Sequence, residues 1–209
     1  MVTLIIQAGG KSSRMGLNKA LLPFQGEPLI ARVYRRLASL VNEVLITVNQ
    51  TTGFEFLGLP LITDLYPDKG ALGGLFTGLQ AARGSLVAVV GCDMPFVNPT
   101  LLHAELDLLD RTEADAVIPF SDSGLEPLHA VYRRETCLPA IYKSLMTNQL
   151  RLVSWLPDVK VQEMPLDEVK VYDHELHAFF NLNTPDDFKK AETMARFEEG
   201  QSNNLSGWE

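Results

Sequence analysis

Residues 4–23 read LIIQAGGKSSRMGLNKALLP, an apolar run that breaks into a loop rich in glycine and positive charge. The run Leu4–Ile6 is apolar throughout, which is typical of a buried strand in a parallel sheet. The eleven residues from position 9 to position 19 hold three glycines and three cations. Glycine lets a ligand approach backbone N–H groups closely, and Lys11, Arg14 and Lys19 supply charge for phosphates. The sequence therefore predicts a strand that ends in a polyphosphate-binding loop.

Two well-known phosphate-binding motifs do not match this loop. Residues 10–12 (GKS) resemble the end of a Walker A motif, but that motif requires a glycine where the chain has Ile5. The glycine spacing of the dinucleotide-binding fingerprint is also missing. What remains is the pattern A-G-G-x-x-x-R-M-G-x-x-K, from Ala8 to Lys19. The simpler alternative, a tight turn with solvated charges, is much less favoured because the spacing of glycines and cations is so specific.

Composition and charge indicate one α/β domain that binds a small anionic ligand. The chain has 209 residues, of which 46% are hydrophobic, enough for a full core. Its net charge of −8 argues against general binding to nucleic acid, which requires a basic surface. The charge is unevenly distributed, since residues 1–36 carry a net +5 and the remaining 173 residues carry −13. A basic region on an acidic protein suits an anionic small molecule.

Cysteine usage and hydropathy lead us to expect a cytoplasmic protein. The spacing of Cys92 and Cys137 fits neither a disulfide framework nor a zinc site, so we expect buried thiols. The N-terminus lacks the basic region of a signal peptide. No apolar run reaches the roughly 18 residues of a membrane span, and we expect no membrane contact.

Strand-like and helix-like segments alternate as far as residue 120. The predicted strands are Val2–Gln7, Glu43–Val48, Leu59–Thr63, Leu86–Val90 and Ala116–Phe120. The predicted helices are Leu29–Leu40, a helix that includes Leu75–Ala82, and Pro99–Leu109. This alternation predicts a doubly wound, mostly parallel sheet between layers of helices, a three-layer α/β/α, Rossmann-like fold.

The pattern changes after a turn signal at residues 121–124. We expect a strand over Leu128–Tyr132, a helix over Glu135–Leu145, a short helix over Leu150–Trp155, and edge strands over Val159–Met164 and Val169–Tyr172. Thr184, Pro185 and two acidic residues mark the start of a last helix. We expect a single domain over residues 1–198 and a flexible tail over residues 199–209.

Carboxylates follow two of the predicted strands. Ligands of doubly wound sheets bind beyond the carboxyl ends of the strands, so polar residues there are candidate site residues. Asp93 comes directly after an apolar strand, which suits a Mg²⁺ ion held by one carboxylate and substrate phosphates. Capping of the next helix is a weak alternative, because Asn98 and Thr100 can cap it. Asp64 begins a loop that could enclose a ribose or a base, and we favour ligand contact over a turn role there.

Two asparagines near the C-terminus are further candidates. Asn181 and Asn183 alternate with Leu182, which places both amides on one face of the chain. Because Thr184 already fills the cap of the last helix, we favour contact with a ligand or with groups around a metal.

Three histidines are weaker candidates. His174 and His177 form an H-x-x-H pair, but without further Cys or His nearby a solvated surface is favoured over a metal site. His129 lies in a strand-like run and is favoured as a buried core or pocket histidine over a catalytic base.

Five segments together resemble the molybdenum cofactor guanylyltransferases, a family of nucleotidyltransferases. They are the pattern at 8–19, the loop at 64–74, CDMP at 92–95, EPLHA at 126–130 and FNLNTP at 180–185. The resemblance extends in order over roughly residues 2–197. The first pattern is shared with cytidylyl- and uridylyltransferases, whereas the later motifs point to the guanylyl branch.

The resemblance implies a role for each matching residue. For the nucleotide and its phosphates, these residues are the backbone of Gln7, Ala8, Gly9 and Gly10, together with Arg14, Lys19, Asp64, Asp93 and either Thr47 or Asn49. Asp93 would also hold Mg²⁺. Asn181 and Asn183 would lie on the side of the pterin acceptor. The family more often has Leu where this chain has Gln7.

The implied reaction is attack of a molybdopterin phosphate on the α-phosphorus of GTP, which releases pyrophosphate and forms the guanine dinucleotide cofactor. The attacking oxygen belongs to the substrate, so the protein need only align the reactants and neutralise charge. The implied partners are GTP, the molybdopterin substrate, other proteins of molybdenum cofactor biosynthesis and recipient molybdoenzymes. We expect a monomer.

Other functions stay open on sequence alone. A cytidylyltransferase for the same pterin, or a sugar-1-phosphate nucleotidyltransferase, would share the fold and the loop. A non-catalytic module that senses GTP or a pterin would not need both Lys19 and Asp93. A nucleotide-diphosphate-sugar glycosyltransferase would require an acidic D-x-D pair where the chain has Asp93-Met94-Pro95.

Overall fold

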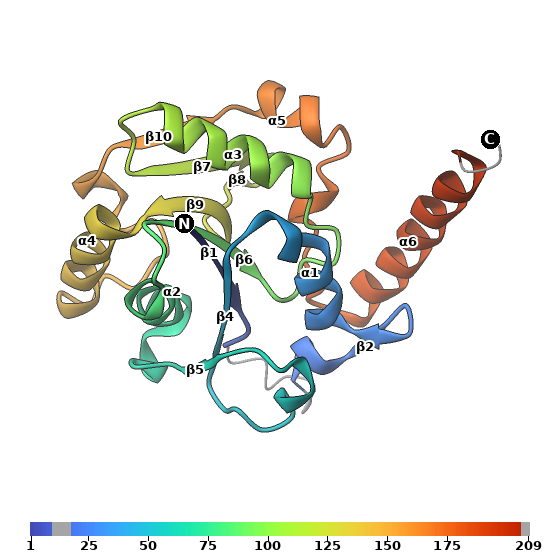
Figure 1. Cartoon of the computed structure of the whole chain (residues 1–209), viewed down its shortest axis with the longest axis horizontal. Helices are drawn as coiled ribbons and strands as arrows, with labels where there is room; N and C mark the ends of the chain where they lie inside the picture. Colours follow the sequence, from blue (N-terminus) through green and yellow to red (C-terminus); the bar gives the residue numbers. More distant parts are fainter. Residues whose placement is uncertain (10–17, 206–209) are drawn as a thin grey trace.

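A computed structural model describes residues 1–9 and 18–205 (Figure 1). In this part of the chain, one mixed sheet has the strand order β10-β7-β9-β6-β1-β4-β5, and β8 pairs with β7. Its strands are β1 Val2–Gln7, β4 Glu43–Val48, β5 Leu61–Thr63, β6 Leu86–Gly91, β7 Ala116–Ser121, β8 Gly124–Leu125, β9 His129–Arg133 and β10 Val161–Met164. The α-helices are α1 Leu29–Leu37, α2 Gly70–Ala81, α3 Pro99–Arg111, α4 Arg134–Met146, α5 Leu166–Tyr172 and α6 Pro185–Leu205.

Parallel pairing dominates the centre of the sheet. β1 is parallel to both β4 and β6, and β5 and β10 are parallel to their neighbours. β9 runs antiparallel to β6 and β7 because it follows β7 through the short turn that includes β8. The predicted α/β fold with a mostly parallel sheet is confirmed, with β9 and the short β8 reversed.

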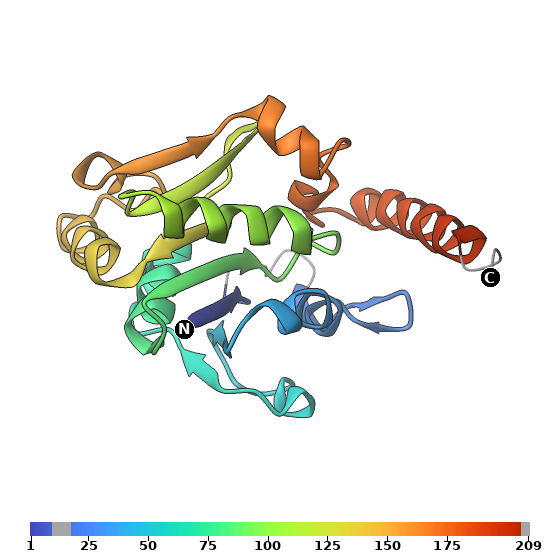
Figure 2. The same cartoon turned by 45° about the horizontal axis from the view of Figure 1, so that its top comes forward.

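Helices cover both faces of the sheet, as the period-two alternation of the strands requires (Figure 2). Leu4 and Ile6 of β1 lie in a core shared with α1, α3 and α5. Ile5, between them, lies in a second core shared with α2 and α4. Each strand of the centre is therefore buried on both sides, which explains its continuous apolar sequence.

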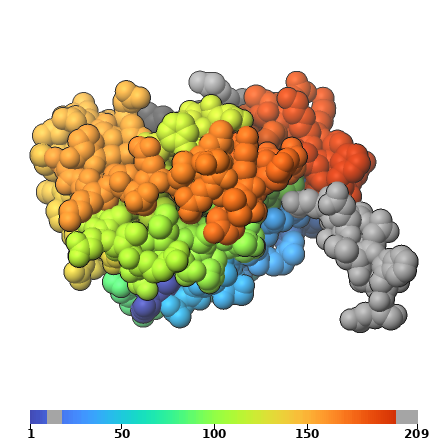
Figure 3. Space-filling model, turned by 90° about the horizontal axis from the view of Figure 1, so that it is seen from above, coloured from blue at the N-terminus to red at the C-terminus, as the bar shows by residue number. Residues whose placement is uncertain are grey.

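The start of α6 packs beside a hairpin formed by β2 Pro23–Phe24 and β3 Glu27–Pro28, and the rest of the helix projects from the body (Figure 1). Phe24, Phe96 and Leu182 form the small core beneath this start. α6 continues to Leu205, past the beginning of the tail expected at residue 199, and the flexibility of that tail stays a prediction. In the view from above, the segment from β10 through α5 lies beside α3 (Figure 3).

The two central strands predicted first, Val2–Gln7 and Glu43–Val48, have the predicted bounds. The strand expected over Leu59–Thr63 is shorter, since it begins at Leu61, directly after Pro60. Proline has no N–H to donate to a neighbouring strand, which accounts for the later start.

Two predicted elements are wrong. Val169–Tyr172, expected as a strand, belongs to α5, which Pro165 precedes and whose first turn holds Asp167 and Glu168. The alternation of apolar residues there is misleading, because Val169 is buried but Val171 is 76% exposed. Leu150–Trp155, expected as a short helix, forms turns instead, followed by a short 3₁₀ helix over Leu156–Asp158.

The helices in the described ranges include none with an apolar stretch long enough to cross a membrane.

Candidate functional site

A cavity of about 260 Å³ opens at the carboxyl ends of β1 and β6. Its lining combines the end of β1, the segment after the 10–17 loop, the start of α2 and the residues that follow β6. The lining residues are Gln7, Ala8, Gly9, Asn18, Lys19, Ala71, Gly91, Cys92, Asp93 and Leu128. This is the edge at which doubly wound sheets bind their ligands.

Backbone hydrogen bonds fix this edge of the sheet. Ala8 N–H donates to Thr47 O at 2.8 Å, and Cys92 N–H donates to Gln7 O at 3.1 Å. Gly9 passes close to the end of β4, because a Cβ placed on it would lie 2.9 Å from Asn49 Oδ1. Any larger residue at position 9 would therefore displace the Asn49 side chain.

Lys19 reaches the cavity from a short 3₁₀ helix, Lys19–Leu21, that is capped by Asn18. The Asn18 carboxamide oxygen accepts from Ala20 N–H at 3.1 Å, which fixes the start of this turn. Lys19 Nζ donates to Asn183 Oδ1 at 2.9 Å. The predicted phosphate-binding cation and one predicted acceptor-side asparagine are therefore in direct contact.

Asp93 follows the end of β6 and lines the same cavity as Lys19. Burial raises the pKa of its carboxyl, and the nearby Lys19 ammonium partly opposes this shift. Its backbone oxygen accepts from Leu182 N–H at 2.9 Å, which joins the strand end to the asparagine-containing segment. A partly desolvated carboxylate is stabilised by a cation, so its environment suits a metal ion as well as Lys19.

The side chains present fit a Mg²⁺ ion that is shared with a substrate. Among the side chains that the structure describes, no cluster of three or more His, Cys, Asp or Glu residues could hold a metal. Mg²⁺ is commonly held by one or two carboxylates, with substrate phosphates and water completing its shell. Asp93, which lines the same cavity as Lys19, matches that pattern.

Asp64 has partners within its own loop. Its Oδ1 accepts from Tyr66 N–H and from Thr77 Oγ1, both at 2.9 Å. These bonds join the end of β5 to α2 and show a turn role, while contact with a nucleoside stays a prediction. Thr47, with 1% exposure, is buried, whereas Asn49 is exposed at the end of β4.

The two predicted acceptor-side asparagines differ in their contacts. Leu182 is buried between them, which agrees with the predicted alternation. Asn183 contacts Lys19, whereas Asn181 Nδ2 donates to Phe179 O at 2.9 Å within its own segment. The structure therefore brings Asn183 into contact with Lys19, whereas Asn181 bonds within its own segment.

His129 is completely buried, as predicted, and its Nδ1 lies 3.1 Å from Glu105 Oε1 of α3. Its ring also packs edge-on against Phe179, with centroids 5.2 Å apart. His174 is exposed beside Glu175, and His177 is half-buried against Phe96. His174 therefore lies on the surface, as expected, whereas His177 is partly buried.

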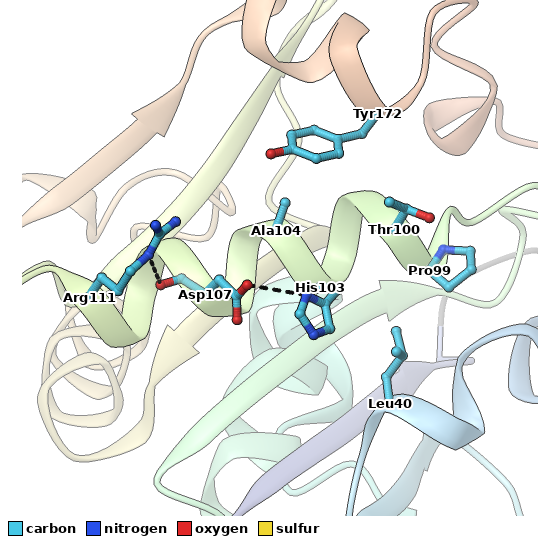
Figure 4. Close-up of a pocket in the computed structure, with 8 residues that line it drawn as sticks. All are labelled: Leu40, Pro99, Thr100, His103, Ala104, Asp107, Arg111 and Tyr172. Atoms are coloured by element: carbon cyan, nitrogen blue, oxygen red, sulfur yellow. Dashed lines mark hydrogen bonds and ion pairs between the residues drawn. The ribbon is translucent and has the colours of Figure 1, made fainter.

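A larger hollow of about 330 Å³ lies along the outer side of α3, between Leu40 and Tyr172 (Figure 4). Its charged residues are exposed and joined to one another: His103 Nδ1 lies 3.3 Å from Asp107 Oδ2, and Arg111 donates to Asp107 O. None of the predicted site residues lines this hollow. Predicted residues Gln7, Lys19 and Asp93 line the cavity at the sheet edge instead.

Gly10 and Arg14 lie outside the described residues, so their predicted roles stay predictions. Sequence reasoning missed five cavity residues: Asn18, Ala71, Gly91, Cys92 and Leu128. Asn18 precedes Lys19 as a typical cap, a signal that could have been read, whereas Ala71 and Leu128 carry no local sign of their position.

Comparison with known proteins identifies the family of this chain. A family profile described as MobA-like NTP transferase domain matches residues 4–159. A protein of Pelotomaculum thermopropionicum named "Probable molybdenum cofactor guanylyltransferase" is 36% identical over 92% of this chain and 93% of its own length. The "Molybdenum cofactor guanylyltransferase" of Desulfosudis oleivorans is 32% identical over 93% of this chain and 96% of its own.

A solved structure has the same fold over nearly the whole chain. Molybdopterin-guanine dinucleotide biosynthesis protein A from Archaeoglobus fulgidus superposes with a TM-score of 0.80 at 26% identity, covering 94% of this chain and 99% of its own. With the profile match over residues 4–159, these similarities establish that the chain belongs to the family of MobA-like nucleotidyltransferases.

Proposed function

We propose that this protein transfers GMP from GTP to the phosphate of molybdopterin, forming the guanine dinucleotide cofactor and pyrophosphate. The observation that carries this proposal is the placement of Lys19 and Asp93 around one cavity beside the glycine-rich backbone at residues 7–9. The family relatives named for the same reaction support it. A non-catalytic binding module is less favoured, because such a module needs no carboxylate opposite the phosphate-binding lysine.

The reaction requires alignment and charge neutralisation more than covalent chemistry by the protein. An acceptor phosphate attacks the α-phosphorus of GTP while the bond to the β,γ-pyrophosphate breaks. Lys19 would neutralise charge on the triphosphate as the bridging oxygen departs. The hydrogen bond from Lys19 to Asn183 would hold the ammonium near the cavity. Less side-chain conformational entropy would then be lost when the triphosphate binds.

Asp93 is the residue that would hold Mg²⁺. When bound, this ion would supply further neutralisation of the phosphates and polarise the α-phosphorus. The acceptor phosphate is already ionised near neutral pH, so no side chain of this chain needs to act as general base.

We assign the nucleotide to the β1 side of the cavity and the acceptor to the side of Asn181 and Asn183. The bond between Leu182 N–H and Asp93 O supports this division, because it places the asparagine segment next to the carboxylate. A role in cofactor synthesis further implies hand-over of the product to recipient molybdoenzymes in the cytoplasm.

Incubation of the purified protein with molybdopterin, Mg²⁺ and radiolabelled nucleoside triphosphates tests the proposal. We expect pyrophosphate release and a labelled dinucleotide with GTP that both depend on the acceptor. Product formation with CTP in place of GTP would instead identify a cytidylyltransferase. Binding of GTP without any product would favour the sensing module.

A further inference from the structure

The side chain of Gln7, the last residue of β1, lies between the sheet and α2 at the floor of the cavity. It is 5% exposed, yet it is one of the residues that line the cavity. Its Nε2 donates to Ala71 O at 2.7 Å. Because a carbonyl can only accept, this bond fixes which end of the amide is the nitrogen and which is the oxygen.

The other end of this amide has no partner among the described residues. Gln7 Oε1 is a buried acceptor that receives no hydrogen bond from the side chains or backbone that the structure describes. Leaving such an acceptor unpaired is unfavourable by roughly 1–3 kcal/mol. Since Gln7 also lines the cavity, a donor that a bound ligand brings can complete this unpaired acceptor.

The helix beside Gln7 is built to admit this amide. A Cβ placed on Gly74 of α2 would lie 2.5 Å from Gln7 Nε2. Any larger residue at position 74 would therefore displace the amide. The glycine is needed here for close approach of the side chain to the helix backbone.

The chemistry of the ligand donor follows from the acceptor. A lone carbonyl oxygen repels phosphate oxygens and attracts an N–H group. Guanine and the pterin ring both carry a 2-amino group next to a ring N–H, on a shared 2-amino-4-oxopyrimidine edge. Hypoxanthine has the same ring N–H but lacks the 2-amino group, so inosine nucleotides separate the two donors.

We propose that Gln7 Oε1 accepts a hydrogen bond from the 2-amino group of this edge and so selects the ligand base. The inference rests on the proposed function and adds a side-chain determinant of specificity to it. Gln7 then acts in recognition through its side chain, beyond the backbone contact that the sequence implies for this position.

Calorimetric titration with GTP and ITP tests this role. Both nucleotides carry the same triphosphate, so their affinity ratio isolates the contribution of the 2-amino group. We expect the wild-type protein to prefer GTP about tenfold, and Gln7→Leu to reduce the ratio to about one. Equal weakening of GTP and ITP by Gln7→Leu would overturn the nucleotide assignment.

A matched pair of glycine variants tests the position of the amide without changing Gln7. Gly74→Ala should displace the amide and lower the GTP:ITP ratio. Gly78→Ala is the same change one turn further along α2, where a Cβ would lie 2.6 Å from Ile5 Cδ1. It should disturb packing and leave the ratio unchanged. A wild-type ratio in Gly74→Ala would contradict the proposal.

A third arm separates the two sources of the 2-amino group. If Gln7→Leu leaves the GTP:ITP ratio unchanged but weakens binding of pterin relative to lumazine, which lacks the amino group, the donor belongs to the acceptor substrate. If neither ratio changes while the wild-type protein still converts GTP, the inference fails and the proposed function stands. If the wild-type protein forms no product, the proposed function fails independently of these ratios.

Discussion

Lys19 and Asn183 are 164 residues apart in the chain, yet Lys19 Nζ donates to Asn183 Oδ1 at 2.9 Å. The first comes from the segment after the glycine-rich loop and the second from the segment before α6. Their contact joins the predicted phosphate side of the cavity to its predicted acceptor side. Binding of one substrate can therefore affect the position of a group that serves the other.

Lys19→Ala should weaken GTP binding and turnover together. Hydrogen bonds to charged groups contribute about 1.5–3 kcal/mol, so the Kd for GTP should rise about tenfold or more. Lys143→Ala is the matched control, because Lys143 pairs with Asp158 on the surface, outside the cavity. Titration calorimetry and a pyrophosphate assay measure both effects. Unchanged GTP affinity in Lys19→Ala would remove the phosphate assignment.

Asp93→Asn should abolish Mg²⁺-dependent turnover without loss of stability. Because burial raises the pKa of Asp93 in the folded protein, ionisation of this carboxyl opposes folding above its unfolded-state pKa. The free energy of unfolding of the wild type should therefore rise as the pH falls through the raised pKa, because protonation of Asp93 removes a buried charge. At pH 8 the Asn variant should melt at the same temperature as the wild type or higher. Turnover at the wild-type rate would place the metal elsewhere.

Asn181→Ala and Asn183→Ala should have different effects. Asn181 does not touch Lys19, so its removal should raise the KM for the acceptor more than the Kd for GTP. Asn183 holds Lys19, so its removal should impair both. Steady-state kinetics with each substrate varied in turn measures the two parameters. Equal loss of both in Asn181→Ala would refute the division of the cavity.

The buried pair of His129 and Glu105 should make stability depend on pH. Burial alone would lower the pKa of His129, but the Glu105 carboxylate raises it above its ordinary value, with a further contribution from Asp173. The stabilisation is then complete below the unfolded-state pKa of about 6.5 and is lost as the pH rises through the raised value. Urea unfolding at pH 6 and pH 9 should show the wild type less stable at the higher pH.

Removal of the histidine tests how much the His129–Glu105 pair contributes to the free energy of unfolding. His129→Leu leaves Glu105 buried without its partner and should cost about 3–5 kcal/mol at pH 8. Burial raises the pKa of Glu105, so its protonation at lower pH should recover part of this loss. A variant with wild-type stability at pH 8 would show that the pair contributes nothing.

The sequence predicted those features that depend on local pattern. Val2–Gln7 and Glu43–Val48 were predictable because buried parallel strands are continuously apolar. Lys19 and Asp93 were predictable as candidates because each follows a strand end in a distinctive motif. α5 was not, because the V-K-V-Y alternation at 169–172 imitates a strand, while Pro165 and two acidic residues mark the start of a helix.

Contacts between distant segments could not be predicted from one sequence. Nothing near Gln7 reveals that its amide meets Ala71 and Gly74 of α2, and nothing near Asn183 reveals Lys19. Such contacts depend on how the layers pack, which periodicity does not specify. They are also the contacts on which the specificity of the cavity depends.

The most direct test of the central claim is calorimetric titration of the purified protein with GTP, CTP, ATP and UTP, each with Mg²⁺. The arrangement of Gln7, Lys19 and Asp93 predicts tight binding of GTP and much weaker binding of the other three. A preference for CTP would contradict the guanylyl assignment, and failure to bind any nucleotide would contradict the assignment of the cavity itself.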